Sequence, residues 1–244
     1  MISANPAANK KLELRSIGSG VLIKKGEHNL IVTCEHVINK GQERYCGAGR
    51  LERPSVPDNP KQHAVGPAKL VATNVGADLA LLKNGSISYS GSQKTYYDLN
   101  RSNFVSENHM QSQLGTASFI LGYWGEMGRA YAYEDGLFYL EAPLYSAIGP
   151  LCKVNVNELL ANIAEKEVLF KNVKDFPQIA PHVPSGGARD LSGISGSGLW
   201  MMTQGRPVLV GIVLGRSHGT ADQHLIRVTP IWVLRDWMNS LSLA

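Results

Sequence analysis

The 244-residue sequence lacks a long apolar run, a strong excess of one charge and an even set of cysteines. Its longest apolar stretch, at about residues 208–215, is far shorter than the roughly 18 residues of a membrane-spanning helix. The 24 basic and 20 acidic residues leave a net charge of only +4, spread along the chain, which does not indicate a nucleic-acid-binding protein. We therefore expect neither a membrane nor a nucleic acid among the partners.

Cysteine usage limits the redox and metal chemistry. The three cysteines, Cys34, Cys46 and Cys152, cannot all pair with one another. Residues 1–11 contain no apolar stretch that could act as a secretory signal, so we expect a cytoplasmic protein with reduced thiols. The seven histidines form no metal-binding motif with the cysteines, so we expect no metal and no cofactor. Cys34 can share a strand face with His36, but we interpret it as a buried apolar residue rather than a nucleophile.

What the sequence does contain is a series of short β-prone segments separated by turn residues, which predicts an all-β protein. Residues 1–14 are expected to form a tail. A polar linker suggests two halves, 15–100 and 101–244. The expected strands lie at 15–25, 30–33, 68–72, 79–82, 117–121, 137–140, 198–203, 208–213 and 225–228.

Two segments have helical periodicity instead. In residues 154–174, apolar residues recur at helical spacing among polar ones, and this predicts a helix within a region of about 151–190. Residues 230–241 begin with a proline and place Ile231, Leu234, Trp237 and Met238 on one face, which predicts a C-terminal helix.

The segment Gly193-Ile194-Ser195-Gly196-Ser197-Gly198 is a candidate nucleophile turn. Small flanking residues leave the Ser195 hydroxyl uncovered and the neighbouring backbone N–H groups available, as attack on a carbonyl requires. Taken alone, such glycine-serine clusters are more often flexible turns than active sites.

Two residues upstream supply the groups that a serine nucleophile needs. His36 follows an apolar strand, and Asp78 precedes another, so both lie where a scaffold presents functional side chains. A serine hydroxyl becomes nucleophilic when a histidine accepts its proton, and a carboxylate orients that histidine. The alternatives are a structural role for His36 and a capping or turn role for Asp78.

Taken together, these residues resemble the trypsin-like (chymotrypsin-fold) serine proteases, and the N-terminal half is similar to the bacterial HtrA-type and glutamyl-endopeptidase-type branch. The similarity covers most of the chain except 39–67, the tyrosine-bearing linker and 151–190. The matching segments occur in the family's order at 18–23, 31–38, 71–83, 119–123, 193–200, 209–213 and 225–237.

The resemblance implies two packed six-stranded antiparallel β-barrels with a catalytic triad in the cleft between them. By it, His36 is the general base, Asp78 orients it, and Ser195 is the nucleophile. The backbone N–H groups of Gly193 and Ser195 would form the oxyanion hole. The implied activity is that of a serine endopeptidase that hydrolyses protein or peptide substrates through an acyl-enzyme intermediate.

Some positions depart from the family pattern. Ile194 replaces the aspartate that pairs with a freed N-terminus in precursor-activated members, so activation by N-terminal cleavage is not expected. We expect no PDZ domain after the protease segment, and residues 151–190 look inserted relative to the family pattern. The inserted helix, or a partner protein, would then regulate activity. An insertion that merely packs on the barrel is an equal alternative.

The resemblance also implies a substrate pocket near the serine. Arg189, Arg216 and His218 would favour an acidic side chain, whereas Asp190 would oppose that preference. The pocket would be lined by Arg189, Asp190, Ser192, Leu214, Gly215, Arg216 and His218.

Other functional classes were compared with this one. An α/β-hydrolase would carry Gly-x-Ser-x-Gly, but Ser197 occupies the last position of that pattern, and the candidate partners precede the serine. The main alternative is a catalytically silent trypsin-fold module that binds a peptide or protein in the same cleft.

Overall fold

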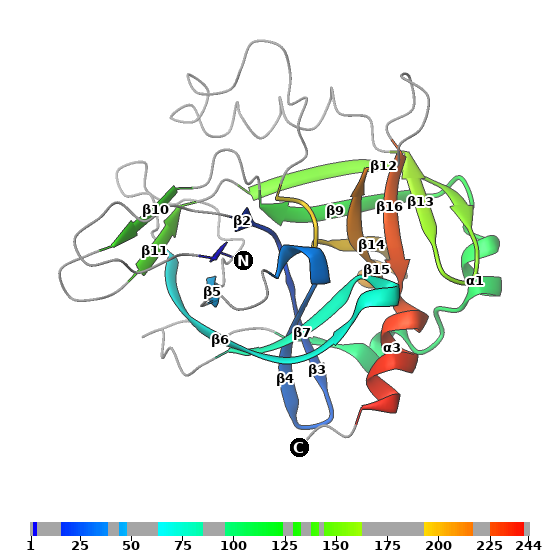
Figure 1. The fold of residues 1–244 in the computed structure, drawn as a ribbon. Helices are drawn as coiled ribbons and strands as arrows, with labels where there is room; N and C mark the ends of the chain where they lie inside the picture. The colour runs from blue at the N-terminus through cyan, green and yellow to red at the C-terminus, as the bar shows by residue number, and fades with distance from the viewer. Residues whose placement is uncertain are drawn as a thin grey trace, which may run out of the picture.

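The computed structural model describes residues 2–3, 16–38, 44–47, 63–84, 96–123, 129–132, 138–141, 144–162, 193–216 and 225–241. These residues are mostly β-strand, with short 3₁₀-helices and two α-helices (Figure 1). None of the helices in these ranges is long and apolar enough to cross a membrane.

The C-terminal half closes into a six-stranded antiparallel barrel, which lies on the right of Figure 1. Its burial follows the two-residue period of strands: in β9, Ser118, Ile120 and Gly122 are buried, whereas Phe119 and Leu121 are partly exposed. The strands in order around the barrel are β12 (Leu144–Val154), β13 (Leu159–Asn162), β16 (Leu225–Pro230), β15 (Arg206–Arg216), β14 (Gly198–Thr203) and β9 (Ala117–Tyr123).

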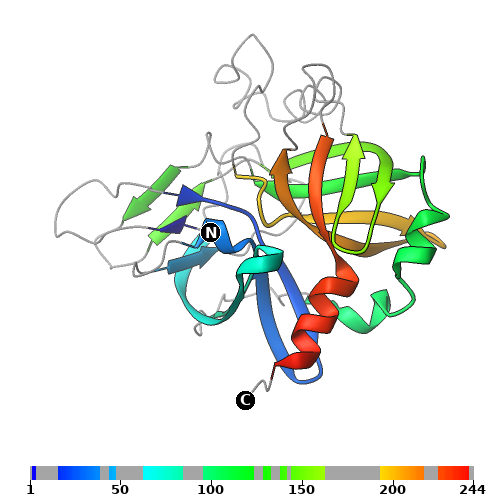
Figure 2. The same cartoon turned by 45° about the vertical axis from the view of Figure 1, so that its right-hand side comes forward.

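The N-terminal half contributes most of a second sheet, which lies beside the barrel (Figures 1 and 2). Within the described ranges this sheet is open, whereas the family resemblance implies a second closed barrel. One edge ends at the two-residue strand β8, which pairs in parallel with β3. The strands along the sheet are β2 (Ser16–Ile17), β1 (Ile2–Ser3), β5 (Arg44–Gly47), β6 (His63–Asn74), β7 (Leu79–Asn84), β4 (His28–Thr33), β3 (Val21–Lys25) and β8 (Tyr97–Asp98).

A hairpin from the C-terminal half joins this second sheet. Strands β10 (Arg129–Ala132) and β11 (Phe138–Glu141) pair with each other, and β11 pairs with β6 through Phe138 and Val65. The hairpin therefore crosses the boundary expected near residue 100. Long-range pairing of this kind leaves no local trace in the sequence.

The helix predicted for residues 154–174 is wrong where the structure describes it. Val154 ends β12, and Leu159–Asn162 forms barrel strand β13. Leu159 and Ala161 are fully buried on either side of the partly exposed Leu160, which is the period of a strand. Pairing with β16 between Leu159 and Val228 outweighs the local helical spacing. The rest of the predicted helix lies outside the described residues.

The C-terminal helix α3 (Ile231–Ser240) begins directly after β16. Ile231, Leu234 and Met238 are fully buried, which places the predicted apolar face against the core. The helix runs from the barrel towards the end of the β3–β4 hairpin (Figures 1 and 2).

One hydrophobic core connects the two halves. Ile23 and Leu81 of the N-terminal sheet belong to the same buried cluster as Leu199 and Leu209 of the barrel. Hydrogen bonds also cross the junction, since Thr229 Oγ1 donates to the Ala77 carbonyl over 2.9 Å. The halves are therefore packed together at the site described next.

Candidate active site

His36 lies in the short 3₁₀-helix η1 (Glu35–Val37), immediately after β4. The preceding residues of β4 are buried, and Val37 is 5% exposed, so the helix is anchored on both sides of the histidine. The His36 side chain itself is 50% exposed. The sequence predicts His36 at the end of a strand. It lies in the helical turn that follows this strand, and its imidazole points outwards.

Asp78 ends a second 3₁₀-helix, η2 (Val75–Ala77), just before β7. Its backbone is left-handed, with φ 51° and ψ 47°, a conformation that aspartate tolerates better than most residues. The Asn74 side chain accepts a hydrogen bond from the Ala77 N–H over 3.1 Å and caps this turn. The unusual backbone places the Asp78 carboxylate beside η1.

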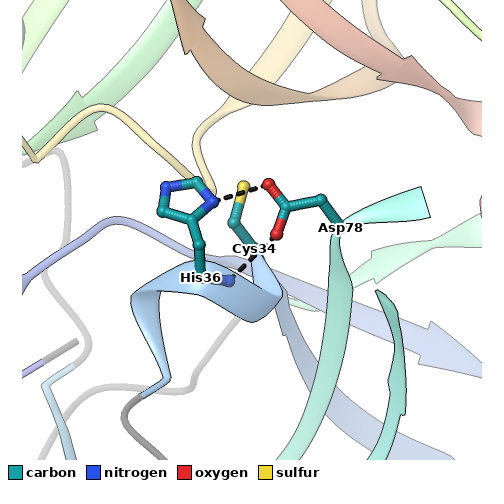
Figure 3. A group of neighbouring side chains, drawn as sticks. All are labelled: Cys34, His36 and Asp78. Carbon is teal, nitrogen blue, oxygen red and sulfur yellow. Dashed lines mark hydrogen bonds and ion pairs between the residues drawn. The ribbon is translucent and has the colours of Figure 1, made fainter. Parts of the chain in front are cut away.

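The two side chains form a direct pair (Figure 3). His36 Nδ1 lies 2.6 Å from Asp78 Oδ2, and the His36 backbone N–H donates to Asp78 Oδ1 over 2.9 Å. Both carboxylate oxygens therefore contact the same residue. This holds the imidazole in one orientation, and among the described residues Nε2 makes no hydrogen bond.

The pair shifts both pKa values. The hydrogen bond to Asp78 raises the pKa of His36 above its ordinary value of 6.5, although partial burial acts in the opposite direction. Partial burial would by itself raise the pKa of Asp78. Hydrogen bonds from the His36 side chain and backbone outweigh it and hold that pKa below its ordinary value of 3.8. At neutral pH the carboxylate is ionised and stabilises positive charge on the imidazole.

Ser195 lies on a tight turn, residues 193–197, directly before β14. Gly193 and Gly196 have φ values of 91° and 89°, in the left-handed region where glycine is favoured. The Ser197 N–H closes the turn by donating to the Ile194 carbonyl over 2.8 Å. Ile194 is 1% exposed and packs in the hydrophobic core, and this apolar contact fixes the turn to the core.

The Ser195 hydroxyl is partly buried and donates to the Leu214 carbonyl over 2.8 Å. In the part of the chain that the structure describes, no hydrogen bond joins Ser195 to His36. Their neighbours in the chain meet at Val213, whose carbonyl accepts from Cys34 Sγ at 3.0 Å and from the Gly196 N–H at 2.8 Å. The structure thus brings His36 and Asp78 into contact and places the Ser195 turn next to them, with the hydroxyl turned towards Leu214.

The two candidate oxyanion donors are the backbone N–H groups of Gly193 and Ser195. Among the described residues, neither the Gly193 N–H nor the Ser195 N–H donates a hydrogen bond. The Ile194 carbonyl, which shares a peptide plane with the Ser195 N–H, is bonded to Ser197. That bond directs the Ser195 N–H away from the turn.

The predicted substrate pocket is described only in part. Leu214 and Gly215 are half-buried, and a Cβ atom built on Gly215 would lie 3.8 Å from Ser195 Oγ. The backbone of Arg216 belongs to β15. Arg189, Asp190, Ser192 and His218 lie outside the described residues.

Cys34, His36 and Asp78 place ligand-type atoms within 4.8 Å of one another, which is close enough to consider a metal ion. Their contacts do not favour one. Burial, together with the negative charge of Asp78, raises the pKa of the Cys34 thiol well above its ordinary value. The thiol is fully buried and donates to Val213, and both Asp78 oxygens are bonded to His36. These atoms are therefore already engaged in bonds within the protein.

Two contacts of this site were not predicted from sequence. The sequence predicts Cys34 as a buried apolar residue, but its thiol also donates to Val213 on the strand next to the Ser195 turn. For Ser19 the sequence indicates a β-prone segment and the family-matching segment 18–23, and neither predicts its direct contact with the turn. The only sequence signal was its position in Gly18-Ser19-Gly20, where small neighbours permit close approach of two backbones.

Iodoacetamide at about pH 8 is expected to modify Cys152 in the folded protein well before Cys34. Cys152 is exposed, whereas the Cys34 thiol is buried and its raised pKa keeps it protonated. Peptide mass mapping over time measures each site separately. Unfolding in denaturant should make the two rates similar, and equal rates in the native protein would contradict the assigned burial.

Comparison with known proteins finds a similar structure but no family or curated protein with a similar sequence. No protein-family model matches the chain. No curated protein matches its sequence either. The solved structure of the MamO protease domain from Magnetospirillum magneticum, in its apo form, superposes with a TM-score of 0.51 at 14% sequence identity. The match covers 97% of this chain and 94% of that domain. The chain therefore has the fold of a trypsin-like protease domain.

Proposed function

We propose that this protein is a serine endopeptidase that hydrolyses protein or peptide substrates. The observation that carries the proposal is the His36–Asp78 pair, in which both carboxylate oxygens orient one imidazole. It stands beside a glycine turn that carries a serine. A trypsin-like fold with this pair next to a serine supports acyl transfer more directly than any other chemistry.

In the proposed mechanism the Ser195 hydroxyl rotates from the Leu214 carbonyl towards His36 Nε2. His36 accepts the proton as Ser195 Oγ attacks the substrate carbonyl, and Asp78 stabilises the resulting imidazolium. The Gly193 and Ser195 N–H groups bind the oxyanion. His36 then donates the proton to the leaving amine, and a water molecule repeats the sequence to release the acid and regenerate Ser195.

A fluorophosphonate probe tests the proposal without knowledge of the substrate. Such a probe reacts with a serine only when a base and an oxyanion site activate it. We expect one equivalent of label, mapped to the peptide that contains Ser195, and no label in Ser195→Ala. Ser118→Ala is a suitable control, because Ser118 lies on β9 and donates to Gly149 within the barrel. A folded protein that resists the probe would favour the silent binding module instead.

The pH dependence of labelling tests the role of His36. The base must be neutral to accept the serine proton, and the Asp78 hydrogen bond keeps His36 protonated to a higher pH than usual. The inactivation rate should therefore rise with pH through a midpoint above 6.5. The measurement is the rate constant for loss of reactive serine between about pH 5 and about pH 9. A midpoint below 6.5 would argue against His36 as the base.

Regulation by the inserted segment is part of the proposal, but the segment is shorter than the sequence indicates. Residues 159–162 form β13, so a segment that restrains the site can begin only after Asn162. Deletions for testing this should accordingly remove residues within 163–190 and leave β13 intact. A faster reaction with the probe would support restraint, whereas unchanged reactivity and stability would favour an insertion without regulatory effect.

A further inference from the structure

Ser19 connects the N-terminal sheet to the Ser195 turn. It is 2% exposed and lies in the short connection before β3. Its N–H donates to the Ser195 carbonyl over 2.8 Å, and its hydroxyl donates to the Gly193 carbonyl over 2.7 Å. A single residue of one half therefore holds two carbonyl groups of the nucleophile turn in the other half.

These bonds fix the peptide planes that surround the nucleophile. The Ser19 hydroxyl orients the plane between residues 193 and 194, and its N–H orients the plane between 195 and 196. The plane between them is fixed by the bond from the Ser197 N–H to the Ile194 carbonyl. Because each peptide is planar, three fixed carbonyls leave little freedom for the direction of the Ser195 N–H.

Ser19 is itself held in place. Thr33, at the end of β4, donates from Oγ1 to the Ser19 carbonyl over 2.7 Å and is fully buried. The contact with the turn is close: a Cβ atom on Gly196 would lie 2.1 Å from the Ser19 carbonyl oxygen and 2.4 Å from Thr33 Oγ1. Only glycine fits there, so the turn is seated directly on the Ser19–Thr33 pair.

We propose that Ser19, supported by Thr33, is a positioning residue that sets the Ser195 turn in its reactive arrangement. This inference rests on the proposed peptidase function. Ile194 is apolar and buried, so it cannot orient the turn through an ion pair. The Ser19 hydroxyl supplies a directional restraint on the same turn, in a form that needs no cleavage of the chain.

The test compares Ser19→Ala with Ser118→Ala. Both serines are buried and donate to a backbone carbonyl, over 2.7 Å and 2.9 Å respectively, but only Ser19 contacts the turn. The fluorophosphonate reaction is resolved into its binding constant and its maximal rate. We expect Ser19→Ala to lower the maximal rate about 10-fold or more with little change in binding, because the Ser195 N–H is misdirected rather than removed. Ser118→Ala should react like the wild type.

The supporting threonine gives a second pair of variants. Thr33→Val removes the hydroxyl at nearly constant shape and should slow the reaction in the same direction. Thr33→Ser keeps the donor and should restore most of the rate. Wild-type rates in both Ser19→Ala and Thr33→Val would overturn the inference, as would equal slowing in Ser118→Ala.

A readout that is independent of activity separates this inference from the proposed function. Amide hydrogen exchange of the peptide that covers residues 193–198 should be faster in Ser19→Ala than in Ser118→Ala, at matched unfolding free energy. If the wild type does not react with the probe, the peptidase proposal fails, and the exchange comparison still decides whether Ser19 orders the turn. Equal exchange in the two variants would refute the positioning role.

Discussion

Replacing Ser195 with alanine is expected to lower peptide-bond hydrolysis by at least about 10⁴-fold while the protein remains folded. Only one oxygen is lost, but it is the atom that would form the acyl-enzyme. The structural cost is small, because that oxygen is partly buried and donates one hydrogen bond, to Leu214. Losing such a bond costs about 0.5–1.5 kcal/mol.

The measurement is the rate of cleavage of a denatured protein substrate by wild type and variant, together with unfolding in denaturant. Wild type and Ser118→Ala should cleave at similar rates. A Ser195→Ala variant that is folded and retains wild-type activity would show that the nucleophile lies elsewhere. If neither protein cleaves, and wild type also resists the fluorophosphonate, the silent binding module becomes the better description.

Replacing Asp78 with asparagine is expected to reduce activity by about 10⁴-fold with little change in the fold. Asparagine also tolerates the left-handed backbone at this position, and its carbonyl can still accept the His36 backbone N–H. It lacks the charge that stabilises the imidazolium, and it can present an NH₂ group to Nδ1. That favours the wrong tautomer, with the proton on Nε2, where the base should be free.

The same variant should change the pH profile in a defined direction. The Asp78 hydrogen bond and charge both raise the pKa of His36, so their removal lowers it. The residual activity of Asp78→Asn should therefore reach its plateau at a lower pH than that of the wild type. Asp98→Asn is the matched control, since Asp98 caps 3₁₀-helix η3 (Leu99–Ser102) through the Asn100 N–H. Similar losses in both variants would assign Asp78 a purely structural role.

Local patterns anticipated the parts of the fold that depend on local chemistry. Short apolar, β-prone runs before His36 and after Asp78 predicted strands, and β4 and β7 lie there. Glycines around Ser195 predicted a tight turn. Gly193 and Gly196 adopt the positive φ values that this turn requires. These features could be expected because β-prone runs bounded by turn residues, and glycines at left-handed turns, leave direct signatures in neighbouring residues.

Other elements depend on partners that are distant in sequence. The apolar spacing in residues 154–162 fits a helix, but the pairing of Leu159 with Val228 makes the end of this segment a strand. The β10–β11 hairpin joins β6 of the other half, which no local pattern encodes. Short apolar segments are compatible with either secondary structure until a neighbour offers hydrogen bonds and a surface to bury.

The chemical groups can be read from the residues themselves: a histidine, a carboxylate and a serine, each placed by local turn or strand chemistry. How these groups meet depends on the packing of distant segments. Asp78 contacts both the ring and the backbone of His36, and Ser19 holds the Ser195 turn from the opposite half. Residue types and spacing specify which hydrogen bonds are possible. Only packing of the two halves around one core selects the carbonyl that each donor reaches.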